Sequence, residues 1–142
     1  MSHPDHRSSV AVLTAAGLGS ISALHVLWGR GSAFPFQNLH DLNDHVVGQQ
    51  VTPSPAACNA VAGLLLVAAV SVERAARRSS PIARVAATGC GLVLGSRAAL
   101  GFTGRTHLAV PGSESEAFRR NDRRVFAPLC LVLALGAVYA ST

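Results

Sequence analysis

The sequence predicts an all-α fold, an integral membrane antiparallel four-helix bundle with two long polar loops on one side. Only 13% of its 142 residues are charged, whereas about 25% is usual for a soluble domain. The uncharged residues gather in four apolar runs of the length needed to cross a bilayer. Four crossings place both termini on one side, and the first and third connections on the other. We therefore expect one four-span membrane domain over residues 1–142.

Each apolar run carries its own start signals. The first has no formal charge and no A-x-A cleavage site follows it, which favours a retained helix over a signal peptide. Ser54 and Ser80 precede the second and third runs, each followed by proline, a typical combination of cap and first-turn residue. Pro128 lies in the first turn of the fourth run, where a missing N–H costs little. The predicted spans are residues 10–28, 56–72, 81–100 and 125–140.

The connections carry most of the charge. Residues 29–55 and 101–124 form the long polar loops, and residues 73–80 form a tight basic turn. All twelve basic residues are arginine, a bias typical of a GC-rich bacterial genome, and they stand near the ends of the runs. This position favours membrane flanks over a nucleic-acid surface. Five arginines flank the side of the termini and six the other side, but the turn is denser in charge. We expect a multi-pass protein of the cell membrane with both termini in the cytoplasm.

Small residues recur every four positions along the third predicted span. In lipid such a stripe lets a second helix approach closely, because packing replaces the hydrophobic effect as the associating force. The simplest partner is the first or fourth span of the same chain, and the alternative is a homodimer seam or a contact in a larger membrane complex. The stripe consists of Ala87, Gly91, Gly95 and Ala99.

Arg97 is an ionisable residue inside an apolar run, at a predicted depth that it shares with other polar residues. Along the helix axis, Arg97 lies about 24 Å from the start of its span, and His25 lies about 22 Å from the start of the first span. Because these two helices run in the same direction, both side chains reach the same leaflet. Asn59 comes to this level too, with Asp122 and Arg124 just above it. Arg97 either extends to the lipid headgroups, or faces inward to pair with Asp122 or bind a ligand.

The first long loop contains a cluster of possible metal ligands. His40, Asp44 and His45 lie in "LHDLNDHVVG", and imidazole and carboxylate groups suit zinc or iron. The spacing matches no established metal motif and equally fits a short interfacial helix with Leu39, Leu42 and Val46 towards lipid, so we predict no metal and no cofactor. The three cysteines form no CxxC motif and are expected to be small buried hydrophobes: Cys58, Cys90 and Cys130.

The segments "ALHVLWGRG", "SRAALGF" and "FRRNDRRVFAPLCLVLAL" resemble the bacterial four-span membrane protein family catalogued as domain of unknown function 3995. The resemblance runs from Ala23 to Leu133 and departs from the family pattern at Gly101, where an acidic or amide residue is expected. It implies four spans and motif residues gathered at one leaflet, and it implies no activity. The motif residues and their neighbours at that leaflet are the candidate ligand contacts: Trp28, Asn59, Phe102, Arg124 and Phe126.

Two classes of function fit these observations. The first is a non-catalytic membrane protein that binds an amphiphilic small molecule, or a partner protein, through a polar crevice. The alternative is a small membrane enzyme acting on a lipid-soluble substrate by isomerase- or cyclase-type chemistry. There His25 and Asp122 would transfer protons, and Arg97 would hold an anionic or carbonyl oxygen. The expected partners are the lipid bilayer and a small amphiphile, and not nucleic acid.

Overall fold

The computed structural model describes residues 6–78 and 80–142, and every regular element in them is helical. Three long helices are α1 (His6–Gly29), α3 (Pro55–Ala76) and α4 (Pro81–Thr103). The fourth span is one run, Glu116–Ser141, made of α5 (Glu116–Asn121), the π-helical turn η3 (Asp122–Phe126) and α6 (Ala127–Ser141). All four spans are long and apolar enough to cross a membrane.

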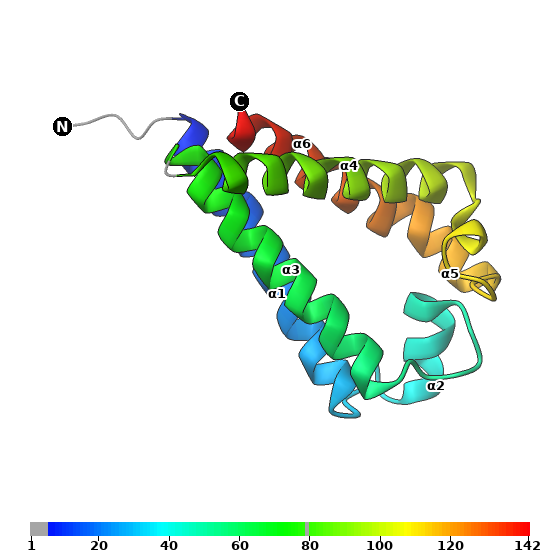
Figure 1. Ribbon diagram of the computed structural model, residues 1–142. Coiled ribbons are helices and arrows are strands. Elements are labelled where there is room, and N and C mark those ends of the chain that lie inside the picture. The colour runs from blue at the N-terminus through cyan, green and yellow to red at the C-terminus, as the bar shows by residue number, and fades with distance from the viewer. Residues whose placement is uncertain (1–5, 79) are drawn as a thin grey trace.

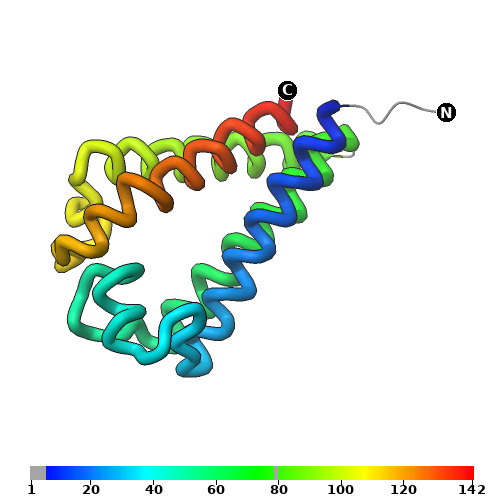
Figure 2. The backbone as a smooth tube through the Cα atoms, turned by 180° about the vertical axis from the view of Figure 1, so that it is seen from behind, coloured from blue at the N-terminus to red at the C-terminus, as the bar shows by residue number. Residues whose placement is uncertain are grey.

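The four spans form two antiparallel pairs that meet at one end and diverge at the other. α1 lies along α3, and α4 lies along α6 (Figure 1). Seen from behind, the two pairs still separate towards the end that carries the long connections (Figure 2). Both described chain ends lie where the pairs meet (Figures 1 and 2). The predicted all-α, antiparallel four-span topology with both long loops on one side is confirmed.

The helix starts follow the predicted caps. The hydroxyl of Ser54 accepts a hydrogen bond from the N–H of Ala57 at 3.2 Å, and that of Ser80 accepts from Ala83 at 3.3 Å. Both hydroxyls satisfy amide groups that have no partner within the first helical turn. At the other end of α4, Gly104 adopts a left-handed conformation with φ 69°, a conformation that favours glycine and commonly ends helices.

The helical run that contains the fourth span begins at Glu116, before the apolar run predicted from residue 125. Its high charge suggested a loop, but the hydroxyl of Ser115 caps this segment by accepting a hydrogen bond from the N–H of Phe118. Pro128 therefore lies well inside the helical run. In a regular α-helix its ring would press against the carbonyl group of Arg124 and leave it without a donor. The π-helical turn η3 precedes the proline, and there the N–H of Ala127 bonds to Asp122, five residues back.

The small-residue stripe of α4 packs against α6 within the chain. A Cβ atom at Gly91 would lie 2.6 Å from the side chain of Val138 and 3.0 Å from the carbonyl oxygen of Ala134. At Gly95 the nearest neighbour would be 3.9 Å away. Ala87 is fully buried, whereas Ala99 is exposed, so the last member of the predicted stripe was wrong. α6 thus occupies the seam that a homodimer would need.

Large apolar side chains cover the outer faces of all four spans. Leu13 is 73% exposed, Leu64 72% and Ile82 80%. Exposed apolar surface of this extent is expected where lipid is the solvent. The chain is therefore a multi-pass membrane protein whose outer faces contact the bilayer. The three cysteines are all free.

The first long connection contains two short helical turns, α2 (Leu39–Leu42) and the π-helical η1 (Asn43–Val47). A short helix with Leu39, Leu42 and Val46 towards lipid was predicted here, but only Leu39 is exposed. Leu42 is 2% exposed, and both Leu42 and Val46 line a cavity. The second long connection contains one 3-10 turn, η2 (Thr106–Leu108).

Candidate functional site

Arg97 faces the protein interior and pairs with Asp122. Its Nη2 atom donates a hydrogen bond to Oδ1 of Asp122 at 2.7 Å. The other carboxylate oxygen accepts a short hydrogen bond from the hydroxyl of Thr106. Asp122 is 2% exposed, so this pair and hydroxyl compensate a buried negative charge. The pairing is one of the alternatives that the sequence left open for Arg97.

α4 and η3 approach each other closely, and this brings the guanidinium group of Arg97 within reach of the carboxylate of Asp122. Gly101 lies directly beside this ion pair, and a Cβ atom there would be 2.7 Å from the Cβ of Ala127 and 3.0 Å from Oδ1 of Asp122. The absence of a side chain at Gly101 lets the two helices approach, and Arg97 reaches the carboxylate one turn away. Thr106 was not predicted, because it lies in an irregular connection where no periodicity marks a side chain as inward-facing.

A cavity of about 420 Å³ lies at the diverging end of the helix pairs and is bordered by both long connections. Arg97 reaches it from one helix pair and His25 from the other, and Thr106 reaches it from the second long connection. Most of the remaining lining is apolar, so the cavity joins a small polar region to a larger apolar one. Its apolar lining includes Trp28, Leu42, Val46, Val61, Val110 and Phe118.

One ring nitrogen of His25 is hydrogen-bonded within its own helix, and the other is left for partners in the cavity. Its Nδ1 lies 2.9 Å from the carbonyl oxygen of Ile21. Because a carbonyl oxygen can only accept, Nδ1 carries the hydrogen, and Nε2 is left for other partners. The ring packs against Trp28 with centroids 4.9 Å apart, and the indole N–H of Trp28 donates to the carbonyl oxygen of Phe34 at 2.7 Å. Both aromatic rings are therefore held in place at the cavity wall.

The two long connections are hydrogen-bonded to each other beside the cavity. We call these contacts the loop clasp. Three side chains of the second connection and α5 donate to backbone carbonyl groups of η1, where a π-helical turn leaves carbonyl groups available. The donors are Ser113 to Val47 at 2.8 Å, Ser115 to Asp44 at 2.6 Å, and Asn121 to His45 at 3.2 Å.

Backbone contacts strengthen the loop clasp. The N–H of Glu114 donates to the carbonyl oxygen of Gly48 at 3.1 Å. Gly48 has a φ of 75°, and a Cβ atom there would lie 2.8 Å from the ring of Phe118. Glycine is needed at this position for both its conformation and the space it leaves. The two long connections are thus joined beside the cavity by side-chain and backbone contacts.

Several predicted contact residues lie away from the cavity. Asn59 is exposed on α3, and Phe102 is 44% exposed near the end of α4. Phe126 packs against Phe118 with centroids 6.2 Å apart instead of lining the cavity. Arg124 is exposed in a separate arginine cluster. Of the five predicted ligand contacts, only Trp28 borders the cavity.

The histidines of the first loop take part in local contacts. Nδ1 of His45 lies 3.0 Å from the carbonyl oxygen of Asp41 and 4.0 Å from the carboxylate of Asp44. Its ring also stacks on Phe36 with centroids 5.3 Å apart. Within residues 6–78 and 80–142, no three His, Cys, Asp or Glu side chains come together to hold a metal ion, so His40, Asp44 and His45 form no such group.

These features define a four-span membrane protein with a cavity at one end of its helices and a buried ion pair at the cavity wall. Residues 18–137 match the family described as protein of unknown function (DUF3995), and the chain belongs to that family. The resemblance seen in the sequence motifs is confirmed. No curated protein and no solved structure matches the chain.

Proposed function

We propose that this protein binds an amphiphilic small molecule in the cavity between its two helix pairs. The observation that carries the proposal is the meeting of His25 and Arg97, from different pairs, at one largely apolar cavity of about 420 Å³. Small-molecule sites commonly have volumes of about 300–1,000 Å³, mostly apolar walls and a few converging polar groups. The polar end of the ligand lies against these two side chains, and its apolar part lies along the remaining wall.

The charge of the site indicates the kind of polar end that it accepts. Asp122 neutralises Arg97 at 2.7 Å, so the pair as a whole carries no net charge. An anionic ligand would have to compete with a buried carboxylate for the same guanidinium group. A hydroxyl or carbonyl group needs no such competition, because it can accept from a remaining N–H of Arg97 and, as a hydroxyl, donate to Nε2 of His25. We infer an uncharged amphiphile with an oxygen-bearing end.

The enzyme alternative has weaker support from the geometry. Acid–base chemistry with His25 and Asp122 requires both groups at the substrate. Asp122 does not line the cavity, and both its oxygens accept hydrogen bonds from protein side chains. Its position is that of a group that orients Arg97. Binding is therefore the function that we propose.

A single tryptophan gives a direct binding assay, because Trp28 lines the cavity and is the only tryptophan in the chain. A brominated long-chain alcohol should quench its fluorescence in a saturable way in detergent micelles. His25→Phe keeps an aromatic ring beside Trp28 and removes the acceptor nitrogen. Loss of one hydrogen bond of about 1 kcal/mol should weaken binding roughly fivefold.

A matched pair of substitutions on α3 separates cavity binding from partition into the micelle. Ala57 lines the cavity and Ala60 does not, although both are exposed on the same helix. Ala57→Phe should abolish saturable quenching by filling part of the cavity, whereas Ala60→Phe should leave it unchanged. Quenching that is linear in alcohol concentration, or equal in both variants, would show that Trp28 reports only on the surrounding detergent.

We also propose that the protein resides in the bacterial cell membrane with both termini in the cytoplasm. The support is the dense basic charge at the end of α3 and in the short turn that follows it, which together carry Arg74, Arg77 and Arg78. Positively charged short connections are typical of the cytoplasmic side.

A further inference from the structure

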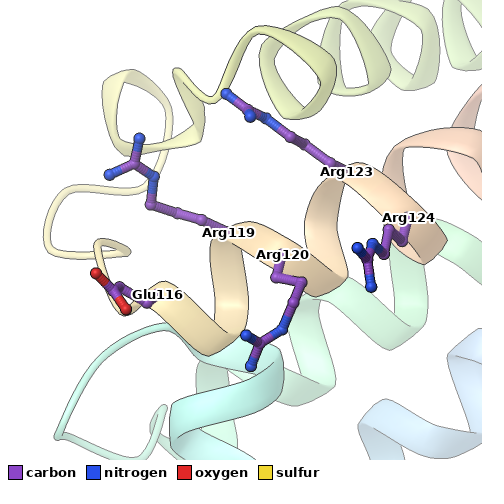
Figure 3. A pocket seen from close by; sticks show the side chains of 5 residues that line it. All are labelled: Glu116, Arg119, Arg120, Arg123 and Arg124. Atoms are coloured by element: carbon purple, nitrogen blue, oxygen red, sulfur yellow. The ribbon is translucent and has the colours of Figure 1, made fainter.

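Four exposed arginines gather at the start of the fourth span, away from the cavity. They lie on two neighbouring helical turns of α5 and η3, and with Glu116 they border a surface hollow of about 420 Å³. Figure 3 shows Arg119 and Arg123 extending to one side of the helix and Arg120 and Arg124 to the other. We call these four residues the arginine cluster. It shares no residue with the lining of the cavity.

The arginine cluster carries uncompensated positive charge. Its members are paired at i and i+4, a spacing at which like charges destabilise a helix. Four arginines and Glu116 give the hollow a net charge of +4 − 1 = +3. The ion pairs found among the described residues are His45–Asp44, Arg77–Glu73 and Arg97–Asp122, so none includes a member of the cluster. Asp122, the one acid within the arginine run, is turned inward to Arg97.

One member of the cluster lies close to the end of α4. A Cβ atom at Gly104 would lie 2.8 Å from Nη2 of Arg123. The guanidinium group therefore lies beside the C-terminal end of α4, where the helix dipole favours a positive charge. Arg123 thus borders the hollow on the side of α4, and all four guanidinium groups of the cluster remain exposed.

Exposed apolar side chains continue from the cluster along the same span. Val125 is 52% exposed, Leu129 40% and Val132 66%. A positively charged hollow followed by an apolar stripe on one membrane helix is complementary to a molecule with an anionic end and acyl chains. Guanidinium groups bind phosphate oxygens through paired hydrogen bonds. In a bilayer, the molecule with this chemistry is an anionic phospholipid.

We propose that the arginine cluster binds the phosphate-bearing headgroup of an anionic phospholipid, whose acyl chains lie along the exposed stripe of η3 and α6. Each basic residue near a membrane surface contributes about 1 kcal/mol to attraction of anionic lipid. This corresponds to roughly a fivefold change in affinity for each arginine. Binding to the cluster is independent of an amphiphile in the cavity.

The test compares lipid retained by the full-length protein after release from nanodiscs that hold equal amounts of phosphatidylglycerol and phosphatidylcholine. Native mass spectrometry should find mainly phosphatidylglycerol on the wild type. The double variants Arg119→Gln/Arg123→Gln and Arg120→Gln/Arg124→Gln should each reduce its affinity by about 25-fold. All four side chains are exposed, and unchanged far-UV circular dichroism would show that the variants fold.

A second double variant provides the control. Arg30→Gln/Arg105→Gln removes the same charge at the same end of the molecule, and both residues are exposed outside the hollow. This control should keep its preference for phosphatidylglycerol. An equal loss in the control, or retention in both cluster variants, would overturn the proposal. Displacement of the lipid by equimolar inorganic phosphate or by an acidic peptide would also overturn it, because the hollow would then select a soluble anion or a protein partner.

Discussion

Arg97→Gln should destabilise the protein more than Asp122→Asn, although each removes one member of the same ion pair. The asymmetry follows from burial. The side chain of Asp122 is 3% exposed, whereas that of Arg97 is 26% exposed. Removal of the guanidinium group leaves a buried carboxylate with Thr106 as its remaining donor among the hydrogen bonds described above. Removal of the carboxylate leaves a guanidinium group that water or headgroups can still reach.

The expected magnitudes differ accordingly. Breaking a buried ion pair by removing one partner typically costs about 3–5 kcal/mol. We expect Arg97→Gln to cost about 3 kcal/mol, at the lower end because a quarter of the arginine side chain is exposed. Asp122→Asn should cost about 1–2 kcal/mol, the usual penalty for an unsatisfied polar group. In the double variant two amides replace the ion pair, so its cost should fall below the sum of the single costs.

The free energy of unfolding can be measured by titrating SDS into mixed micelles and following helicity by circular dichroism. Arg105→Gln serves as the control, because Arg105 is exposed at the same end of the molecule and should change stability by less than about 0.5 kcal/mol. An Arg97→Gln variant as stable as this control would show that the guanidinium group extends to the headgroups. A larger loss for Asp122→Asn than for Arg97→Gln would refute the burial argument.

Two further predictions concern packing and topology. Gly91→Ala should lower the unfolding temperature in detergent, because the new methyl group would lie 2.6 Å from the side chain of Val138. Gly95→Ala should be tolerated, because its nearest neighbour would be 3.9 Å away. Equal effects of the two substitutions would contradict the packing of α4 against α6. After replacement of the native cysteines, single cysteines at the exposed residues Glu114 and Thr142 should react with a membrane-impermeant maleimide from opposite sides of the membrane. Labelling from one side would exclude the four-span topology.

The sequence predicted the parts of the structure that depend on local signals and on helix geometry. Uncharged runs and Ser-Pro starts located the spans, because both act within one helix. The Arg97–Asp122 pair was among the predicted alternatives, because a fixed rise per residue gives each polar residue a depth. Irregular backbone has no such rule, so Thr106 was missed. The helical start of the fourth span was also missed, because four arginines in a short segment resemble a solvated loop.

Tertiary packing determined what could not be predicted. The divergence of the helix pairs depends on contacts between spans, and no periodicity within one span encodes it. That divergence brings Leu42 and Val46 inward, so the apolar side of the first loop lines a cavity instead of contacting lipid. It also separates Arg124 from His25, which line different pockets although the sequence predicted them at a similar depth. The position of a side chain along its helix could be predicted from the sequence, but the neighbouring helix that it faces could not.

The divergence of the two helix pairs also gives the molecule different widths in the two leaflets. Spans of 22–26 residues are about 33–39 Å long, which exceeds the roughly 30 Å of hydrocarbon in a bilayer. Helices longer than the bilayer thickness cross it obliquely, and here the two pairs diverge from each other towards the loops (Figure 1). The end with the loops therefore displaces more lipid area than the end with the termini. Such a wedge fits best in a membrane that is convex on the side of the loops.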